Sequence, residues 1–263
     1  MPAPASSSKY VFWGLNGLLG AIFIVQLAEP GLSTVWDGAM IALAAVASVA
    51  ALGRRLPLQN VLPAALITAG IGGSAHALSG IPDFSLPFGP IIFNAAAGPE
   101  IFNTVPWTVP LLWVIAIFNG RGVARLILRP WRKVKNYGLW LIGLTGVLAM
   151  AFDLALEPFA WHVKHFWLWR PTRLVVTWQG TNLLNFLGWA GVALLIMMLA
   201  TPLLIRKQPG HASAPDVHPL VVWLGALALF AAGSARIGEG WPVAMDAAIA
   251  LATTIFAVRG MKW

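Results

Sequence analysis

Long apolar runs separated by short polar breaks make up most of this 263-residue chain. A run of about 17–25 mainly apolar residues is long enough to cross a bilayer as a helix. About eight such runs occur, and most stop at glycine, proline or charged residues. We therefore predict one all-α integral membrane domain over residues 1–263, a polytopic bundle of about eight transmembrane helices. The expected spans are 11–28, 35–52, 61–79, 101–118, 137–156, 183–205, 219–235 and 241–258.

The composition excludes an ordinary water-soluble protein. Hydrophobic residues make up 59% of the chain and Asp, Glu, Lys and Arg only 10%, whereas about a quarter of an average soluble domain is charged. The net charge of +8 does not indicate nucleic-acid binding, because the basic residues lie in short breaks between spans, where they set topology.

The distribution of basic residues predicts the orientation of the bundle. With the N-terminus inside, 13 of the 17 Lys and Arg fall on the inner side, as expected for cytoplasmic loops. Most acidic residues fall toward the outer side, with Asp216 the exception. We therefore expect a multi-pass protein of the bacterial cytoplasmic membrane with a cytoplasmic N-terminus. The counts of charged residues on the two sides include Asp83, Arg173, Arg206 and Lys207.

The fourth expected span and the segment after it have distinctive sequences. Pro106 and Pro110 lie inside the expected span, where prolines are tolerated but bend a helix. The following segment, 121–135, carries arginines at helical spacing with apolar residues between them. This pattern predicts an amphipathic helix on the membrane surface.

Asp153 and Glu157 are the strongest candidates for chemistry. They are four residues apart, so a helix places both on one face. A carboxylate inside hydrocarbon is costly unless it is neutralised or paired. One of the two is therefore expected to hold a proton and act as an acid. The alternative is that Asp153 is structural and hydrogen bonds to a neighbouring helix.

Other candidates gather toward the same outer side. His76 follows the small residues 72–75, which allow close approach of a helix or ligand, although a packed interfacial histidine is the simpler interpretation. Glu100 follows Pro99, where it would either act in the site or cap a helix. Side-chain amides able to hold water come from Asn94, Gln179, Asn182 and Asn185.

Aromatic residues crowd the outer segment 157–182, which we expect to be a loop. Trp161, Phe166, Trp167, Trp169 and Trp178 are typical of an interfacial belt. They are also suited to line a site for a long apolar ligand, or to stabilise a cation through their ring faces.

The chain offers little to a metal or a covalent mechanism. It has no cysteine, which excludes disulfides and thiolate ligands. His162 and His165 lack the carboxylate–histidine pattern of a di-iron site. We expect neither a metal nor a redox cofactor.

Four stretches together resemble the membrane carotenoid hydratases, the bacterioruberin-type and γ-carotene 1′,2′-hydratase family of carotenoid biosynthesis proteins. They are LPFGPIIFNAAAGPEIFNTVPWTVPLLW (86–113), FDLALEP (152–158), FWLW (166–169) and WQGTNLLNFLGW (178–189). The resemblance covers roughly residues 74–189. Two positions depart from the family pattern: Glu157 stands where Asp is usual, and His76 stands where an acid is expected.

The resemblance implies addition of water to the terminal double bond of an acyclic ψ-end group, such as that of lycopene or γ-carotene. It implies that Asp153 and Glu157 supply acid and base, assisted by His76 and Glu100. Water and substrate would contact Asn94, Asn185, Gln179, Asn182, Trp178, Trp167 and Phe88. Besides the carotenoid and the lipid bilayer, other enzymes of the pathway are expected partners.

Two other functions fit the same pattern. A transporter or proton-coupled carrier also has intramembrane acids and proline-broken helices, but its polar residues should lie near the bilayer midplane. A non-catalytic carotenoid-binding subunit would retain pigment without depending on Asp153.

Overall fold

The computed structural model describes residues 5–29, 34–81, 84–171, 176–205 and 214–263, so Asp83, Arg173, Arg206 and Lys207 lie outside the described residues. Within them, eight helices are long and apolar enough to cross a membrane, which confirms the predicted all-α polytopic bundle. They are α1 (Ala5–Ala28), α2 (Thr34–Gly53), α3 (Leu58–Gly80), α4 (Thr108–Ile127), α5 (Tyr137–Pro158), α6 (Leu183–Leu204), α7 (His218–Arg236) and α8 (Gly240–Met261).

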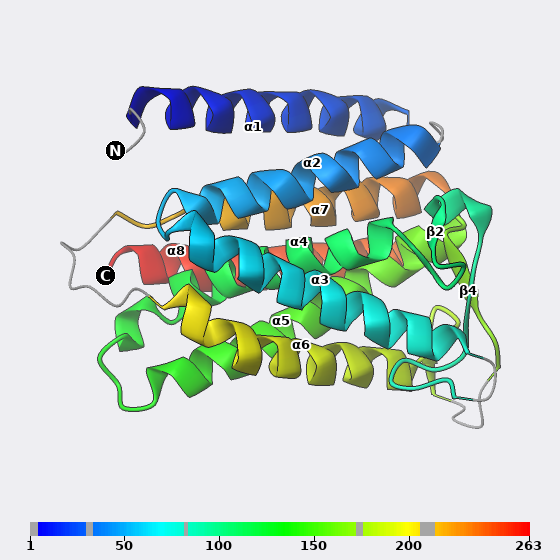
Figure 1. Cartoon of the computed structure of the whole chain (residues 1–263). Coiled ribbons are helices and arrows are strands. Elements are labelled where there is room, and N and C mark those ends of the chain that lie inside the picture. Colours follow the sequence, from blue (N-terminus) through cyan, green and yellow to red (C-terminus); the bar gives the residue numbers. More distant parts are fainter. Residues whose placement is uncertain (1–4, 30–33, 82–83, 172–175, 206–213) are drawn as a thin grey trace.

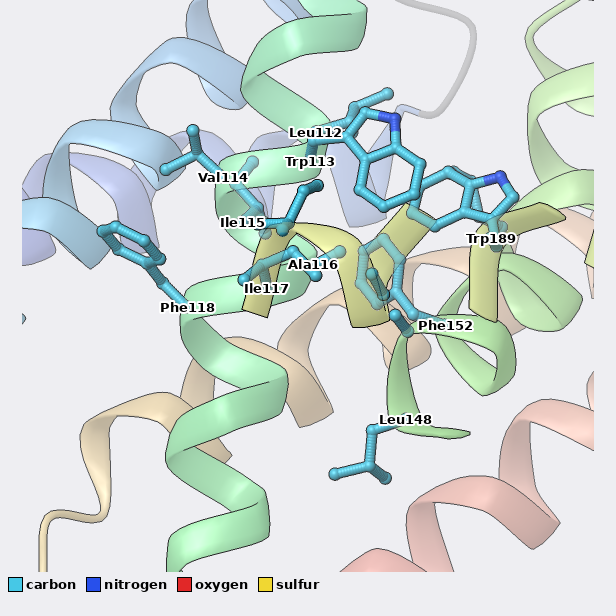
Figure 2. Close-up of a cluster of buried hydrophobic side chains, with 14 of the residues drawn as sticks. Leu112, Trp113, Val114, Ile115, Ala116, Ile117, Phe118, Leu148, Phe152 and Trp189 are labelled. Carbon is cyan, nitrogen blue, oxygen red and sulfur yellow. The ribbon is translucent and has the colours of Figure 1, made fainter. Parts of the chain in front are cut away.

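Helix α4 forms the centre of the bundle. It packs against α2, α3, α5, α7 and α8, and nearly every side chain from Val109 to Ala124 is buried. Figure 2 shows part of this core, where Trp113 of α4 lies beside Trp189 of α6, with Phe152 of α5 close by. The two indoles stack with ring centroids 3.9 Å apart.

Short strands and single helical turns gather at one end of the bundle, opposite the two chain termini (Figure 1). Strand β1 (Ile91–Phe93) pairs with β4 (Trp167–Trp169), β2 (Glu100–Ile101) with β3 (Val105–Pro106), and β5 (Thr177–Trp178) with β6 (Thr181–Asn182), all antiparallel. The turns are η1 (Ala95–Ala97) and the π-helical η3 (Phe159–Val163), while η2 (Arg129–Trp131) lies at the other end. This end is the outer side in the predicted orientation.

The predicted start of the fourth span was wrong. Residues 101–107 lie in the β2–β3 hairpin and the residue after it, and the helix begins only at Thr108. Pro106 explains this, because a proline disfavours helical geometry in the residue before it, here Val105. Pro110 then falls in the first turn of α4, where its missing N–H costs nothing.

The predicted surface helix over 121–135 was also wrong. Helix α4 continues through Ile127, so Arg121 and Arg125 belong to its last turns, and a 3₁₀ turn, η2, follows. Arg121 is buried and donates from Nη2 to the Leu204 carbonyl oxygen at the end of α6 (2.7 Å). The span extends past Phe118 because polar groups here bind other helices, as when Asn119 donates to Ser48 Oγ.

Close packing of α3 on α4 depends on Gly72. A Cβ at this position would lie 2.2 Å from Trp113 Cγ, an atom of a rigid and fully buried ring. We expect Gly72→Ala to cost about 1–3 kcal/mol of stability through overpacking, seen as a lower thermal unfolding midpoint in detergent. Gly70→Ala is the matched control, because nothing lies within 4 Å of its Cβ. Equal midpoints for the two variants would contradict this close approach.

Candidate functional site

Two carboxyl groups on the last turns of α5 form the centre of the candidate site. Asp153 is fully buried and Glu157 is 2% exposed. Their four-residue spacing places them on one helical face, and the two carboxyls lie near enough to interact. Neither forms an ion pair with a described Lys, Arg or His. Hydrogen bonds therefore provide the stabilisation of any charge on this pair.

Glu157 accepts three hydrogen bonds on one carboxylate oxygen. The donors to its Oε2 are Trp169 Nε1 at 2.7 Å, Thr181 Oγ1 at 2.9 Å and Trp167 Nε1 at 3.3 Å. Charge-assisted bonds to a carboxylate are stronger than bonds between neutral groups. This donor set is therefore suited to hold Glu157 in place and to stabilise its charged form.

Asp153 has a much smaller donor set. Asn185 of α6 donates from Nδ2 to Asp153 Oδ2 at 2.5 Å. Asp153 Oδ1 and Asn185 Oδ1 are both buried, and neither has a hydrogen-bond partner among the described residues. Buried polar atoms normally have a partner. Asn185 Oδ1 is therefore available to a water molecule or a polar group of a ligand. Asp153 is available to the same groups or to a proton shared with Glu157, which lies within hydrogen-bonding reach.

Asn182 and the α6 N-terminus hold Asn185 in position. Asn182 is the N-cap of α6, and its Oδ1 accepts from the Asn185 backbone N–H at 3.1 Å. Gly89 allows the segment before β1 to approach, since its φ is +101° and a Cβ there would lie 2.6 Å from Asn182 Nδ2. Asn182 and Asn185 are thus held at the start of α6, against the segment before β1.

Strand alternation brings both tryptophans to Glu157. Trp167 and Trp169 are two apart on β4, so both point to the same face of the strand. Both are buried, which shows that they are not part of a lipid-facing belt. The expected loop over 157–182 is therefore largely ordered structure, with Glu157 still on α5 and η3, β4, β5 and β6 after it.

A two-residue turn brings Thr181 to Glu157. Gln179 and Gly180 connect β5 and β6 with φ of +50° and +87°, the combination of a type I′ hairpin turn. The Gln179 backbone oxygen contacts His162 Nε2 at 3.0 Å, and Trp178 Nε1 donates to the Leu154 carbonyl oxygen at 3.1 Å. These two contacts hold the β5–β6 hairpin against α5 and η3, and no described contact joins Gln179 or Trp178 to either carboxyl.

His76 and Phe88 lie in an aromatic cluster next to this site. Trp113 Nε1 donates to His76 Nδ1 at 3.1 Å, and the Phe88 ring lies 4.1 Å from the imidazole, centroid to centroid. His76 also meets Trp189 at 5.8 Å between ring centroids, and Trp189 follows Asn185 by one turn of α6. His76, on α3, therefore contacts an indole ring that lies one turn of α6 from Asn185, the residue that binds Asp153.

The structure does not bring Asn94 and Glu100 into this cluster. Asn94 Nδ2 donates to the His165 carbonyl oxygen at 3.0 Å, beside the β1–β4 pair. Glu100 is exposed in the β2–β3 hairpin, paired across it with Pro106, and so does not cap a helix. Asn94 has a structural contact that ties the two strand-bearing segments together.

Sequence reasoning missed Thr181 and a second polar cluster near the same end of the bundle. The Gln-Gly turn before Thr181 was the available signal, because such a turn fixes the direction of the next side chain. The second cluster joins Asp37 of α2, Gln26 of α1 and Lys164: Lys164 Nζ lies 2.6 Å from Asp37 Oδ1, and Gln26 Nε2 donates to Asp37 at 2.8 Å. All three side chains are buried.

A long apolar cavity of about 570 Å³ begins at this second cluster. Its lining runs from Asp37 to Arg54, which are separated by the length of α2, so the cavity extends about 25 Å along the bundle at 1.5 Å per residue. Phe152 and Leu156 of α5 form part of its wall. Asp153 and Glu157 do not line it, so α5 separates the cavity from the carboxyl pair.

The carboxyl cluster has the parts needed for proton transfer inside the membrane. It contains two adjacent carboxyl groups with different donor sets, two acceptor oxygens without a described partner, and two tryptophans whose N–H groups point at Glu157. Such a site can move a proton to an apolar group and hold a water molecule beside it. Tryptophan faces can stabilise a nearby positive charge.

Comparison with known proteins identifies a family. A family model described as "Carotenoid biosynthesis protein" matches residues 36–255, a region that includes the carboxyl cluster and seven of the eight membrane helices of the described chain. No curated protein and no solved structure matches the chain. The predicted membership of a family of carotenoid biosynthesis proteins is confirmed.

Proposed function

Because the chain belongs to the carotenoid biosynthesis protein family, we propose that it hydrates the terminal 1,2 double bond of an acyclic carotenoid end group. The product is a tertiary 1-hydroxy carotenoid, heavier than the substrate by one water. The observation that carries this proposal is the buried Asp153–Glu157 pair, with acceptor oxygens on Asp153 and Asn185 that have no partner among the described residues. The proposed location is the bacterial cytoplasmic membrane, with the substrate drawn from the bilayer.

The difference between the two donor sets supports separate roles for the carboxyls. Asp153, with a single amide donor, delivers a proton to the less substituted carbon of the double bond. A tertiary cation forms at the other carbon, shielded by tryptophan rings. Glu157, held by three donors, takes the proton from the attacking water.

Asn185 has the position of a water-binding residue in this scheme. Its Nδ2 is committed to Asp153, while its Oδ1 has no partner among the described residues. An amide oxygen that accepts a hydrogen bond from water orients a lone pair of that water toward the cation. Glu157 then returns its proton to the adjacent Asp153, so each cycle adds one water per double bond with no overall change in oxidation state.

Lateral entry from lipid suits a substrate of this kind. Leu183 and Leu187 of α6 are 41% and 56% exposed, so α6 presents an apolar face to the bilayer. Asn185, two residues from each, lies on the opposite, buried face of the same helix. We propose that the end group enters beside α6 and reaches Asn185 from the bilayer. The polyene then remains in contact with hydrocarbon.

A direct test is expression in a lycopene-producing bacterium, with mass spectrometry of the extracted carotenoids. We expect a product heavier than lycopene by one water, or by two where both ends react. Feeding γ-carotene in the same way tests a substrate with one ψ-end. Unchanged masses for lycopene, γ-carotene and longer acyclic carotenoids would overturn the hydratase proposal.

A second function is favoured by the apolar cavity, because neither carboxyl lines it. A protein that only stores or delivers a carotenoid needs such a cavity and no acid. It predicts that pigment co-purifies with unchanged mass and that its retention does not depend on Asp153. The same extracts therefore discriminate the two functions.

A further inference from the structure

A cavity of about 260 Å³ lined by several arginines lies at the end of the bundle that holds the chain termini. It is bounded by the α2–α3 turn, the end of α4, the start of α5 and the segment before α7. Arginine is the most frequent side chain in its lining: Arg55, Arg121, Arg125, Arg129 and Arg132. This cavity is distinct from the carboxyl cluster, which lies at the opposite end.

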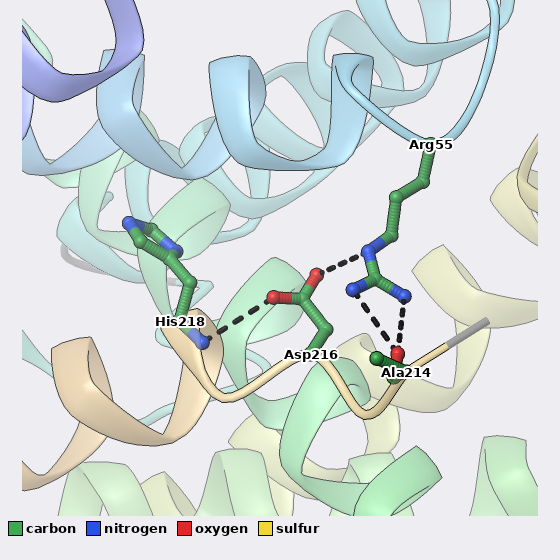
Figure 3. A network of polar contacts seen from close by, with 4 residues as sticks. All are labelled: Arg55, Ala214, Asp216 and His218. Atoms are coloured by element: carbon green, nitrogen blue, oxygen red, sulfur yellow. Dashed lines mark hydrogen bonds and ion pairs between the residues drawn. The ribbon is translucent and has the colours of Figure 1, made fainter. Parts of the chain in front are cut away.

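Asp216 neutralises only one of these arginines. Figure 3 shows the Arg55 Nε–Asp216 Oδ2 ion pair, at 2.9 Å, and the Arg55 bonds to the Ala214 carbonyl oxygen. The other Asp216 oxygen accepts from the His218 backbone N–H at 3.3 Å. Both oxygens of this carboxylate are thus engaged.

The other four arginines have no ion-pair partner among the described residues. Asp216 is the one described acid at this end of the bundle. Residues 206–213, which precede Ala214 in the sequence, include neither Asp nor Glu. The cavity therefore combines five cations with one anion.

Arg121 makes this imbalance costly. It is only 4% exposed, its one hydrogen bond goes to the Leu204 carbonyl oxygen, and its Nε has no partner among the described residues. A buried charge without a counter-charge costs several kcal/mol. Arginines that only set topology can stay in water or snorkel to it, so topology explains exposed Arg125 and Arg132 but not Arg121.

We propose that this cavity binds an anionic phosphate group, with Arg121 at its base and Arg125 and Arg132 at its entrance. Guanidinium groups match phosphate oxygens with paired, charge-assisted hydrogen bonds. Basic pockets between membrane helices on the cytoplasmic side bind anionic lipid headgroups in this way. The phosphate belongs either to such a headgroup or to a free phosphate compound, and hydration of a carotenoid is not required for either.

The test uses the purified full-length protein in nanodiscs. One arm compares phosphatidylcholine with phosphatidylcholine plus phosphatidylglycerol, and counts retained phosphatidylglycerol by native mass spectrometry. The other arm keeps pure phosphatidylcholine and titrates inorganic phosphate, with chloride at equal ionic strength, while following the unfolding midpoint. Retention of the anionic lipid identifies a headgroup site, and stabilisation by inorganic phosphate identifies a free-phosphate site.

The double variant Arg125→Gln with Arg132→Gln tests the cavity without disturbing the buried Arg121. We expect the double variant to bind the ligand of whichever arm gave a positive result roughly tenfold or more weakly, because it loses two charge-assisted hydrogen bonds. Arg259→Gln is the matched control, an exposed arginine near the end of α8 that does not line the cavity. The proposal fails if neither ligand binds, or if Arg259→Gln loses as much affinity as the double variant.

Discussion

Replacing Asp153 with Asn is expected to abolish the hydrated carotenoid while the protein remains in the membrane. Asparagine keeps the size of the side chain and its contact with Asn185 but cannot deliver a proton. Loss of a positioned acid or base typically costs about 10²–10⁴ in rate. In extracts from the lycopene-producing host, the product with one added water should fall below detection while lycopene accumulates.

Two further variants separate chemistry from folding. Asp246→Asn is the matched control, because Asp246 of α8 is also a buried membrane acid, 1% exposed, but lies outside the carboxyl cluster. It should retain product. Glu157→Gln should lose product as well, since it removes the proposed base while the tryptophan donors stay. Product from Asp153→Asn at the wild-type level would show that another group supplies the proton.

The sequence predicted the membrane helices well because apolarity and length are local properties. Seven of the eight expected spans lie on the observed helices with only small differences at their ends. The prediction of the fourth span was wrong at both ends, because apolar character and helical structure do not coincide there. Val105–Pro106 is apolar but extended, and Arg121 is charged but helical. Neither the geometry that proline imposes on Val105 nor the partner of Arg121 on α6 appears in a hydropathy profile.

The candidate site was predictable only where helical spacing creates it. Asp153 and Glu157 meet because they are four residues apart on α5, and their shared face follows from the sequence. Thr181 and Trp169 reach Glu157 through the β5–β6 turn and the pairing of β4 with β1, a strand far away in the sequence. Asn185 depends similarly on the packing of α6 against α5. Pairing partners of this kind cannot be read from a single sequence.

The cavity and the carboxyl cluster also show why composition alone left two interpretations of the aromatic residues open. Trp167 and Trp169 resemble an interfacial belt by type and position, yet their N–H groups bind a buried carboxylate instead of water. Phe152 and Leu156, which are ordinary apolar residues of a span in the sequence, form the wall of the long cavity. Helix α5 therefore presents polar chemistry on one face and apolar lining on another.

Replacing Lys164 with Met is expected to destabilise the protein more than Gly72→Ala does. Lys164 lies just after η3 and pairs with Asp37 across the bundle, and both side chains are 5% exposed. Removing one partner of a buried ion pair leaves an uncompensated charge and costs about 3–5 kcal/mol. The thermal unfolding midpoint in detergent should fall sharply. Arg170→Met, an exposed cation in the same segment, should change stability by about 0.5 kcal/mol or less.

The double variant Asp37→Asn with Lys164→Met tests whether charge is the cause. Removing both charges should recover much of the stability, because a neutral pair no longer leaves a buried carboxylate alone. The Gln26 side-chain amide, which now donates to the Asp37 carboxylate, can still donate to the amide oxygen that the substitution leaves at that position. If the double variant is as unstable as Lys164→Met alone, packing of the lysine stem is responsible instead. Recovery would establish that the lone charge on Asp37, at the end of the long cavity opposite Arg54, causes the instability of Lys164→Met.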